Sequence, residues 1–234
     1  RKTNIIFFTL YWPNSLMEWD FLFQKKEVKM TTIIHPTYFP NIEHFSHLLR
    51  SKSLSFEIND FYQKQTLRNR TSIYSPNGRL NLVIPVKFSS KKKERLKDIK
   101  ICNDIKWQKN HLKSIQTAYR SSPYFEFFED YFSEIFEKKE KFLVDVSIKS
   151  IEIIFKILEL EFKYTFTKEY NSQYVTENDL RNISNKKGKA VKNLTNQYTQ
   201  VFENKFGYIH NLSTIDLIFN EGIGGLEYFN TPNM

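Results

Sequence analysis

The sequence has little cysteine, glycine or proline: one cysteine (Cys102), six glycines and seven prolines in 234 residues. A single cysteine excludes an internal disulfide and a zinc site built from cysteines, and it favours a reducing compartment. The scarcity of glycine and proline excludes a collagen-like or low-complexity chain. No run of 18 apolar residues is present, so we expect no membrane-spanning helix and a cytoplasmic protein.

Apolar residues make up 40% of the chain, with 22 phenylalanines and 13 tyrosines, which is enough for a sizeable core. The formal net charge of +9 indicates an anionic partner. A phosphorylated small molecule, a nucleic acid or an anionic lipid would each fit this charge. Nucleic acid is disfavoured, because the aromatic residues recur at helix-core spacing instead of lying between basic residues.

The first 29 residues differ from the rest. The sequence begins at Arg1, and a regular strand pattern begins only at Met30, which we interpret as the native start. We expect residues 1–29 to be an N-terminal extension, either untranslated or disordered, and residues 30–234 to form a single domain. A signal peptide is the alternative, although residues 5–12 form a short apolar run without a small-residue cleavage site.

The first half of the chain predicts a small sheet. Residues 31–39 and 54–58 are strand-like, and a helix between them begins after a potential cap at Asn41. This order predicts a βαβ unit with a parallel pair. Asn77 and Gly78 separate two further apolar runs (71–74 and 80–86), which is a strong hairpin signal.

The second half is predicted to be largely helical. Helical periodicity covers residues 107–120, 125–136 and 142–160, and a short strand is expected over 162–167. The predicted fold class is therefore α/β: an N-terminal βαβ-type sheet with a β-hairpin, followed by a largely helical C-terminal half.

Two polar stretches are predicted to be loops. Residues 89–97 are rich in lysine and indicate an exposed loop, and residues 171–197 indicate a long loop of the kind that forms lids or binding elements. A last helix is expected from Ser213, with Asp216 as a capping-box partner, to Gly222.

A cationic cluster follows the second predicted strand: Lys64, Arg68 and Arg70, with Asn69 among them. Ligands of open α/β sheets bind outside the carboxyl ends of the strands, and guanidinium groups suit phosphate. The cluster indicates recognition of a diphosphate or a phosphopantetheine-like group; a solvated surface is the alternative.

Histidine supplies the candidates for proton transfer. His111 lies on the apolar side of its helix and would serve as a general base if that face lined a cleft, or as a core residue if it did not. His35 ends the first strand and is the second candidate. His44 and His47 have a spacing that could chelate a metal, but no third ligand accompanies them, so we interpret them as surface histidines and expect no metal.

The chain resembles the WbqC-like protein family, most closely its Bacteroidetes-type members, over residues 30–229. Four blocks at the expected spacing carry the resemblance: Tyr62-Gln63-Lys64-Gln65-Thr66-Leu67-Arg68-Asn69-Arg70; Leu80 to Val86; Trp107-Gln108-Lys109-Asn110-His111 continuing to Phe125; and Tyr198-Thr199-Gln200-Val201-Phe202 followed by Asn211-Leu212-Ser213 and Asp216 to Asn220.

The first family block departs from the wider pattern, which resembles His-Gln-Pro-Asn-Tyr-Leu-Pro-Trp. Pro36, Tyr38 and Pro40 match, but the family's histidine falls on Ile34 and His35 takes the glutamine position. The family's histidine therefore has no histidine at the matching position of this chain, and a catalytic role for it does not carry over to His35 by alignment.

The resemblance implies a bacterial protein of O-antigen, lipopolysaccharide or other surface-polysaccharide biosynthesis, and a glycine (aminoacyl) transferase acting on a nucleotide- or lipid-linked sugar. Such an enzyme needs an anion site, a base and oxyanion donors. The substrate would be an anionic small molecule, and no cofactor is specified. The residues expected to serve are Lys64, Arg68, Arg70, Tyr38, Trp107 and Asn211 for binding, and His111, His35 and Asn69 for catalysis, with Asn211 as a second oxyanion donor.

Two other functions remain open at this point. A basic adaptor in a polysaccharide assembly complex would explain the surplus charge and the lysine-rich residues 89–97. A nucleotidyltransferase-like α/β enzyme would use a paired histidine motif, to which His44 and His47 correspond only loosely. A deep cleft would favour an enzyme and a flat basic face an adaptor.

Overall fold

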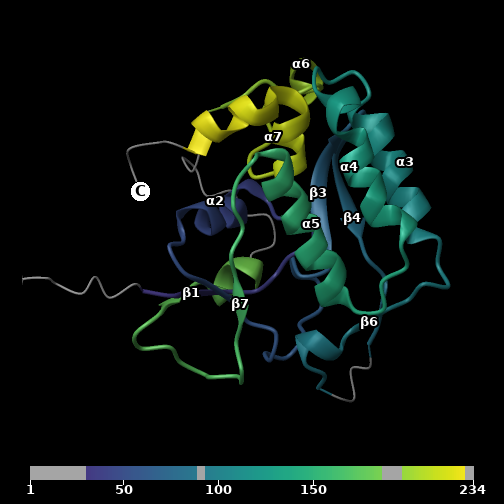
Figure 1. Ribbon diagram of the computed structural model, residues 1–234. Coiled ribbons are helices and arrows are strands. Elements are labelled where there is room, and N and C mark those ends of the chain that lie inside the picture. Colours follow the sequence, from purple (N-terminus) through teal and green to yellow (C-terminus); the bar gives the residue numbers. More distant parts are fainter. Residues whose placement is uncertain (1–29, 89–92, 186–196, 230–234) are drawn as a thin grey trace, which may run out of the picture.

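The computed structural model describes residues 30–88, 93–185 and 197–229 and has the predicted α/β fold, shown in Figure 1. Residues 1–29, and with them the expected N-terminal extension, lie outside the described residues. The strands are β1 (Thr32–Ile34), β2 (Leu54–Phe56), β3 (Arg70–Ser75), β4 (Gly78–Val83), β5 (Val86–Lys87), β6 (Lys100–Ile101), β7 (Thr165–Phe166) and β8 (Asn178–Asp179). The α-helices are α2 (Ile42–Arg50), α3 (Trp107–Tyr119), α4 (Phe125–Glu137), α5 (Leu143–Ile157), α6 (Glu203–Phe206) and α7 (Thr214–Glu221), and the 3₁₀ helices are η1 (Leu96–Asp98), η2 (Arg181–Asn185) and η3 (Gly222–Phe229).

Four strands form a parallel sheet in the order β7-β2-β1-β8. The predicted βαβ unit is confirmed: β1 and β2 pair in parallel through α2, and the Asn41 side chain caps α2 by accepting a hydrogen bond from the His44 N–H at 2.9 Å. From β1, the chain places β2 and then β7 on one side of β1, and it places β8 on the other side of β1. The order therefore changes direction between β1 and β8, where open α/β sheets bind ligands.

The two faces of this sheet differ in polarity because side chains alternate along a strand. Ile34, Leu54 and Phe56 point into the hydrophobic core, which also contains Phe45 of α2 and Phe155 of α5 with ring centroids 5.2 Å apart. The opposite face carries serine and threonine around Ile33 of β1. In Figure 1 the connection between β7 and β8 extends to the lower left, away from α3, α4 and α7.

The predicted hairpin and helices are also confirmed. β3 and β4 pair antiparallel around a turn in which Gly78 has a φ of 90°. α3 buries the predicted face, including Trp107, His111 and Ile115, and α5 is buried along most of its length. No helix of the described residues combines the length and the apolar character needed to cross a membrane.

Two loop predictions need correction. The expected loop 171–197 contains β8 and η2, because β8 is held by backbone pairing to β1 and needs no apolar side chains; residues 186–196 lie outside the description. In the lysine-rich stretch, residues 89–92 are not described. Lys93, Arg95 and Lys97 are exposed as predicted, whereas Leu96 of η1 is buried at 1% exposure.

The predicted capping box at the start of α7 is wrong, although the bounds of the helix agree with the prediction. The Ser213 hydroxyl donates to the Phe39 carbonyl at 3.1 Å and makes no cap hydrogen bond. The Asp216 carboxylate turns inward and accepts hydrogen bonds from the Tyr119 and Tyr198 hydroxyls, both at 2.7 Å. A buried tertiary network has replaced the local motif.

Candidate functional site

The carboxyl ends of the four parallel strands bring polar residues together. His35 follows β1, Glu57 follows β2, Thr167 follows β7, and Arg181 lies two residues after β8. We call these residues, with Asp60, Arg68, Asp179, Ser184 and Asn185, the carboxyl-edge cluster. Its position at the change of strand order is the usual ligand position of an open α/β sheet.

His35 is the centre of the cluster. Its Nε2 lies 3.0 Å from Asp60 Oδ2, and its Nδ1 lies 3.0 Å from Ser184 Oγ and 3.2 Å from the Arg181 carbonyl oxygen. Burial lowers the pKa of His35 to about 4, although the hydrogen bond to Asp60 raises it, so the ring is neutral at pH 7. A neutral ring that donates from Nε2 to Asp60 leaves Nδ1 as an acceptor. Its donor is then Arg68 Nη2 at 3.3 Å, because the Arg181 carbonyl only accepts and the Ser184 hydroxyl donates to that carbonyl.

Arg68 is a buried cation with incomplete compensation. Its side chain is 0% exposed, Nη1 donates to Asn185 Oδ1 at 2.7 Å, and Nη2 lies 3.1 Å from His35 Nε2. The nearest carboxylate oxygen, Asp60 Oδ2, is 3.6 Å from Nη2, and Nε has no hydrogen-bond partner. Burial lowers the pKa of Arg68 to about 10, so it keeps its charge at pH 7. Such a charge favours an anionic ligand.

Glu57 and Arg181 hold the strand ends in place. Glu57 is fully buried and accepts hydrogen bonds from the Asn59 N–H at 2.6 Å, the Thr167 hydroxyl at 2.9 Å and the Tyr174 hydroxyl at 3.1 Å. Arg181 donates to both carboxylate oxygens of Asp179, at 2.8 and 2.6 Å, which raises the pKa of Arg181 and lowers that of Asp179. The two groups therefore fix the cluster's geometry.

The cluster opens to solvent at Asp60, whose side chain is 16% exposed while that of His35 is 1% exposed. Beside it, Phe61 and Tyr170 form an exposed aromatic pair with ring centroids 6.3 Å apart. Lys93 Nζ lies 5.7 Å from the centre of the Phe61 ring. Exposed aromatic rings beside a polar cluster are typical of a ligand-binding surface.

The predicted cationic cluster is divided between three surroundings. Arg68 joins His35, whereas Lys64 is exposed and lies 4.8 Å above the Phe88 ring. Arg70 lines a small hollow, which it shares with Tyr38 and Asn211 among others. Three predicted binding residues thus lie around one hollow, but its volume of about 10 Å³ holds no more than a water molecule.

His111 is packed inside the protein. It is 6% exposed, its Nδ1 lies 3.0 Å from the Tyr38 hydroxyl, and the Trp107 and Phe136 rings lie 5.2 and 6.4 Å from its ring. Burial lowers the pKa of His111 to about 4. Trp107 is itself 2% exposed. These contacts connect His111 to the small hollow only through Tyr38.

The two asparagines predicted to donate to an oxyanion are engaged with the protein. Asn69 Nδ2 donates to the Ile84 carbonyl at 2.9 Å. Asn211 Oδ1 accepts from the Glu43 N–H at 3.0 Å, and its Nδ2 donates to Glu43 Oε2 at 3.2 Å, which joins the C-terminal segment to the start of α2.

The interpretation of His44 as a surface residue is wrong. It is 0% exposed, because α2 turns this position toward the core, and neither ring nitrogen has a hydrogen-bond partner. Within the described residues, no group of three or more histidine, cysteine, aspartate or glutamate side chains is placed to hold a metal ion.

Most partners of His35 are not among the residues predicted from the sequence. Asp60 lies two residues after the second predicted strand, and this position could have placed it at the site. Glu57 falls inside the predicted strand (residues 54–58), although β2 ends at Phe56. Arg181 and Ser184 lie in a polar stretch without periodicity and gave no such signal.

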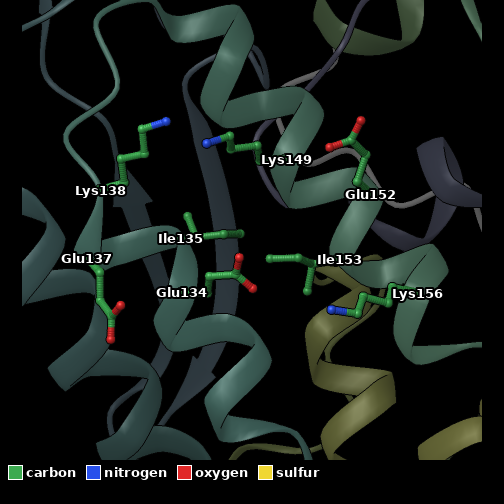
Figure 2. Close-up of a pocket in the computed structure, with 8 residues that line it drawn as sticks. All are labelled: Glu134, Ile135, Glu137, Lys138, Lys149, Glu152, Ile153 and Lys156. Atoms are coloured by element: carbon green, nitrogen blue, oxygen red, sulfur yellow. The ribbon is translucent and has the colours of Figure 1, made fainter.

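A separate hollow of about 360 Å³ lies between α4 and α5, and Figure 2 shows its lining. Three glutamates and three lysines surround two isoleucines there, so the formal charges cancel. None of the predicted site residues lines it. We interpret it as a charge-balanced surface groove.

The fold and the cluster together define a class: an α/β protein with a candidate ligand site at the carboxyl ends of a parallel sheet. The chain belongs to the WbqC-like protein family, whose model matches residues 35–191. This match begins at His35 and includes Asp60, Arg68 and Ser184. No curated protein and no solved structure was found to match the chain.

Proposed function

We propose that this chain is a cytoplasmic transferase of surface-polysaccharide biosynthesis, including that of O-antigen. It moves an acyl group, such as glycyl, from an activated donor to a nucleotide- or lipid-linked sugar. The observation that carries this proposal is the incompletely compensated Arg68 beside the His35–Asp60 pair. The association of the WbqC-like family with surface-polysaccharide gene clusters supplies the substrate class.

The cluster suits an anionic sugar nucleotide. The Arg68 charge would attract a diphosphate, which would also compensate the buried cation. The exposed rings of Phe61 and Tyr170 would stack on a base, since every nucleobase has a π-face that fits an aromatic side chain. The nearby Lys93 adds positive charge at the same opening.

Asp60 and His35 supply the proton chemistry of this proposal. An amine or hydroxyl of the sugar hydrogen-bonds to Asp60, the exposed member of the pair, while the His35 Nε2–H orients the carboxylate. The sugar nitrogen or oxygen attacks the acyl carbon, the bond to the donor's leaving group breaks, and the acceptor's proton passes to Asp60. The positive charge of Arg68 stabilises negative charge that develops in this step.

Purified protein incubated with aminosugar nucleotides and activated glycine tests the proposal by mass spectrometry. We expect a product heavier by one glycyl group. Asp60→Asn should lower kcat by roughly a hundredfold, because general-base catalysis contributes about that much, with a much smaller effect on nucleotide-sugar affinity. Arg68→Gln should instead weaken that affinity by tenfold or more, which isothermal titration calorimetry would measure.

Lys113→Gln on the exposed side of α3 is the matched control for loss of a positive charge and should leave both quantities unchanged. Circular dichroism would verify that each variant folds. Equal nucleotide-sugar affinity in wild type and Arg68→Gln would refute the assigned anion site.

The adaptor alternative has one observation in its favour. α4 and the residue before it present Tyr124, Phe127 and Tyr131 to solvent, with Phe127 72% exposed. Exposed aromatic groups of this kind mark interaction surfaces. A wild-type protein that binds no sugar nucleotide but loses a complex on Phe127→Ser substitution would favour the adaptor.

A further inference from the structure

We infer that the serine- and threonine-rich face of the parallel sheet, which we call the polar sheet face, binds the sugar ring of the substrate. The inference depends on the proposed function for the nature of the complete substrate, but its evidence is separate. Strands of parallel sheets are normally covered on both faces by helices and are apolar on both. In this sheet only one face joins the core, so the polarity of the other face needs an explanation.

The register of the strands places hydroxyl side chains side by side around one apolar residue. Ser55 is aligned with Thr165 on one side and with the apolar Ile33 on the other, and Thr31 Oγ1 lies 3.2 Å from Ser53 Oγ. These residues line a hollow of about 340 Å³, within the size range of small-molecule sites. Its other lining residues come from 166–177, and no helix residue of the described chain contributes.

Ser55 offers a hydroxyl group to the hollow. Its side chain lines the hollow and is 7% exposed, yet within the described residues its hydroxyl has no hydrogen-bond partner. Solvent reaches this hydroxyl from the hollow, and a ligand hydroxyl there would replace the solvent contact. Hydroxyl groups both donate and accept, so they suit a ligand that also carries several hydroxyls.

The charges of the hollow exclude a phosphate and fit a sugar. Lys168 is outnumbered by Glu169 and Glu177, so the lining has a formal charge of −1. Carboxylates accept hydrogen bonds from hydroxyl or amine groups and repel phosphate. Phe166, which is 42% exposed, and Tyr174 add aromatic surface for the apolar side of a sugar ring.

The hollow shares a wall with the carboxyl-edge cluster. Thr167 and Tyr174 both line the hollow, and both donate a hydrogen bond to Glu57 of the cluster. A sugar in the hollow would therefore lie beside the cluster, with its phosphates toward Arg68. The geometry assigns the two halves of one substrate to two adjoining surfaces, the sugar to the hollow and the phosphates to the side of the cluster that carries Arg68.

Saturation-transfer NMR with free N-acetylglucosamine, N-acetylgalactosamine and glucosamine tests this inference without a nucleotide or a donor. We expect saturation transfer to ring protons of at least one sugar. Ser55→Val, which removes the hydroxyl and adds bulk, should weaken binding about tenfold. Glu177→Gln at the mouth of the hollow is a second variant that disturbs the strands less. Thr117→Val, which removes an exposed hydroxyl on α3, is the control and should bind as the wild type does.

Failure of the inference and failure of the proposed function give different results. No saturation transfer to the wild type from any of the three sugars, or unchanged binding in both Ser55→Val and Glu177→Gln, overturns the inference. Glycyl transfer with an unchanged KM in both variants also overturns it and leaves the proposed function intact. Sugar binding that is lost in Ser55→Val, without any acyl transfer, supports the inference and contradicts the proposed function.

Discussion

Buried polar side chains in this chain differ in whether the protein supplies their partners. Asp216 is fully buried, and hydrogen bonds from Tyr119, Tyr198 and Gln200 surround its carboxylate. His44 is equally buried, but neither of its ring nitrogens has a partner. The Asp216 carboxylate therefore links elements together, whereas the buried His44 imidazole lowers the stability of the folded state.

Replacing His44 by leucine should stabilise the protein. The substitution removes an unsatisfied polar group at similar volume, so we expect the free energy of unfolding at pH 7 to rise by about 1–2 kcal/mol. Urea unfolding followed by circular dichroism measures this change. His210→Gln, at an exposed histidine, is the control and should change stability by less than about 0.5 kcal/mol. A destabilised His44→Leu variant would mean that the imidazole has a role that its contacts do not reveal.

Single elements differ in how well sequence predicts them. α3 was predicted nearly to the residue, because one face of the helix buries Trp107, His111 and Ile115 at helical spacing. β8 was missed, because it has two polar residues and is held by backbone hydrogen bonds to a strand distant in sequence. Amphipathic periodicity is a local signal, whereas edge-strand pairing depends on tertiary structure.

Two glycines with positive φ allow a test at the ends of elements. Gly78 in the hairpin has a φ of 90° and no atom within 4 Å of an added Cβ. Gly222 after α7 has a φ of 61°, and a Cβ there would lie 2.7 Å from two ring carbons of Tyr124. Gly78→Ala should cost about 1–2 kcal/mol from backbone strain alone. Gly222→Ala should cost a further ~1–3 kcal/mol from the contact, as measured by denaturant unfolding.

The double variant Gly222→Ala with Tyr124→Ala separates the two contributions. Removing the ring should recover the part of the cost that comes from the contact and leave the backbone strain. If the two glycine variants lose equal stability, the contact with Tyr124 contributes nothing.

At the scale of the whole molecule, the site combines residues far apart in sequence. Ser184 lies 149 positions from His35, and Arg68 lies 117 positions from Asn185. His35 and Arg68 are predictable from the sequence, since strand ends and arginine clusters are recognisable locally. The contact between these two residues could not be predicted from the sequence. The separation of Arg68 from Lys64 and Arg70 likewise becomes visible only in the three-dimensional structure. Convergence of strand ends is a property of topology that local patterns do not encode.

The buried ionisable groups make the whole protein sensitive to acid. Burial lowers the pKa of His35 and His111 to about 4 and that of His44 to about 3, so these rings stay neutral in the folded state. In the unfolded chain they bind protons below pH 6.5, and stability falls as the pH drops from 6.5 toward 4. Asp216 acts in the opposite direction, because burial raises its pKa to about 6 and the folded state binds its proton first.

Near pH 5 the unfolded state should therefore bind about two protons more than the folded state, and the free energy of unfolding should fall by about 3 kcal/mol per pH unit. Urea unfolding between pH 6.5 and 4.5 measures this slope. His44→Leu removes one proton from the difference and should make the slope shallower, whereas Asp216→Asn removes the opposing group and should make it steeper. Equal slopes in the two variants would contradict this origin of the acid sensitivity, since the two substitutions change the proton balance in opposite directions.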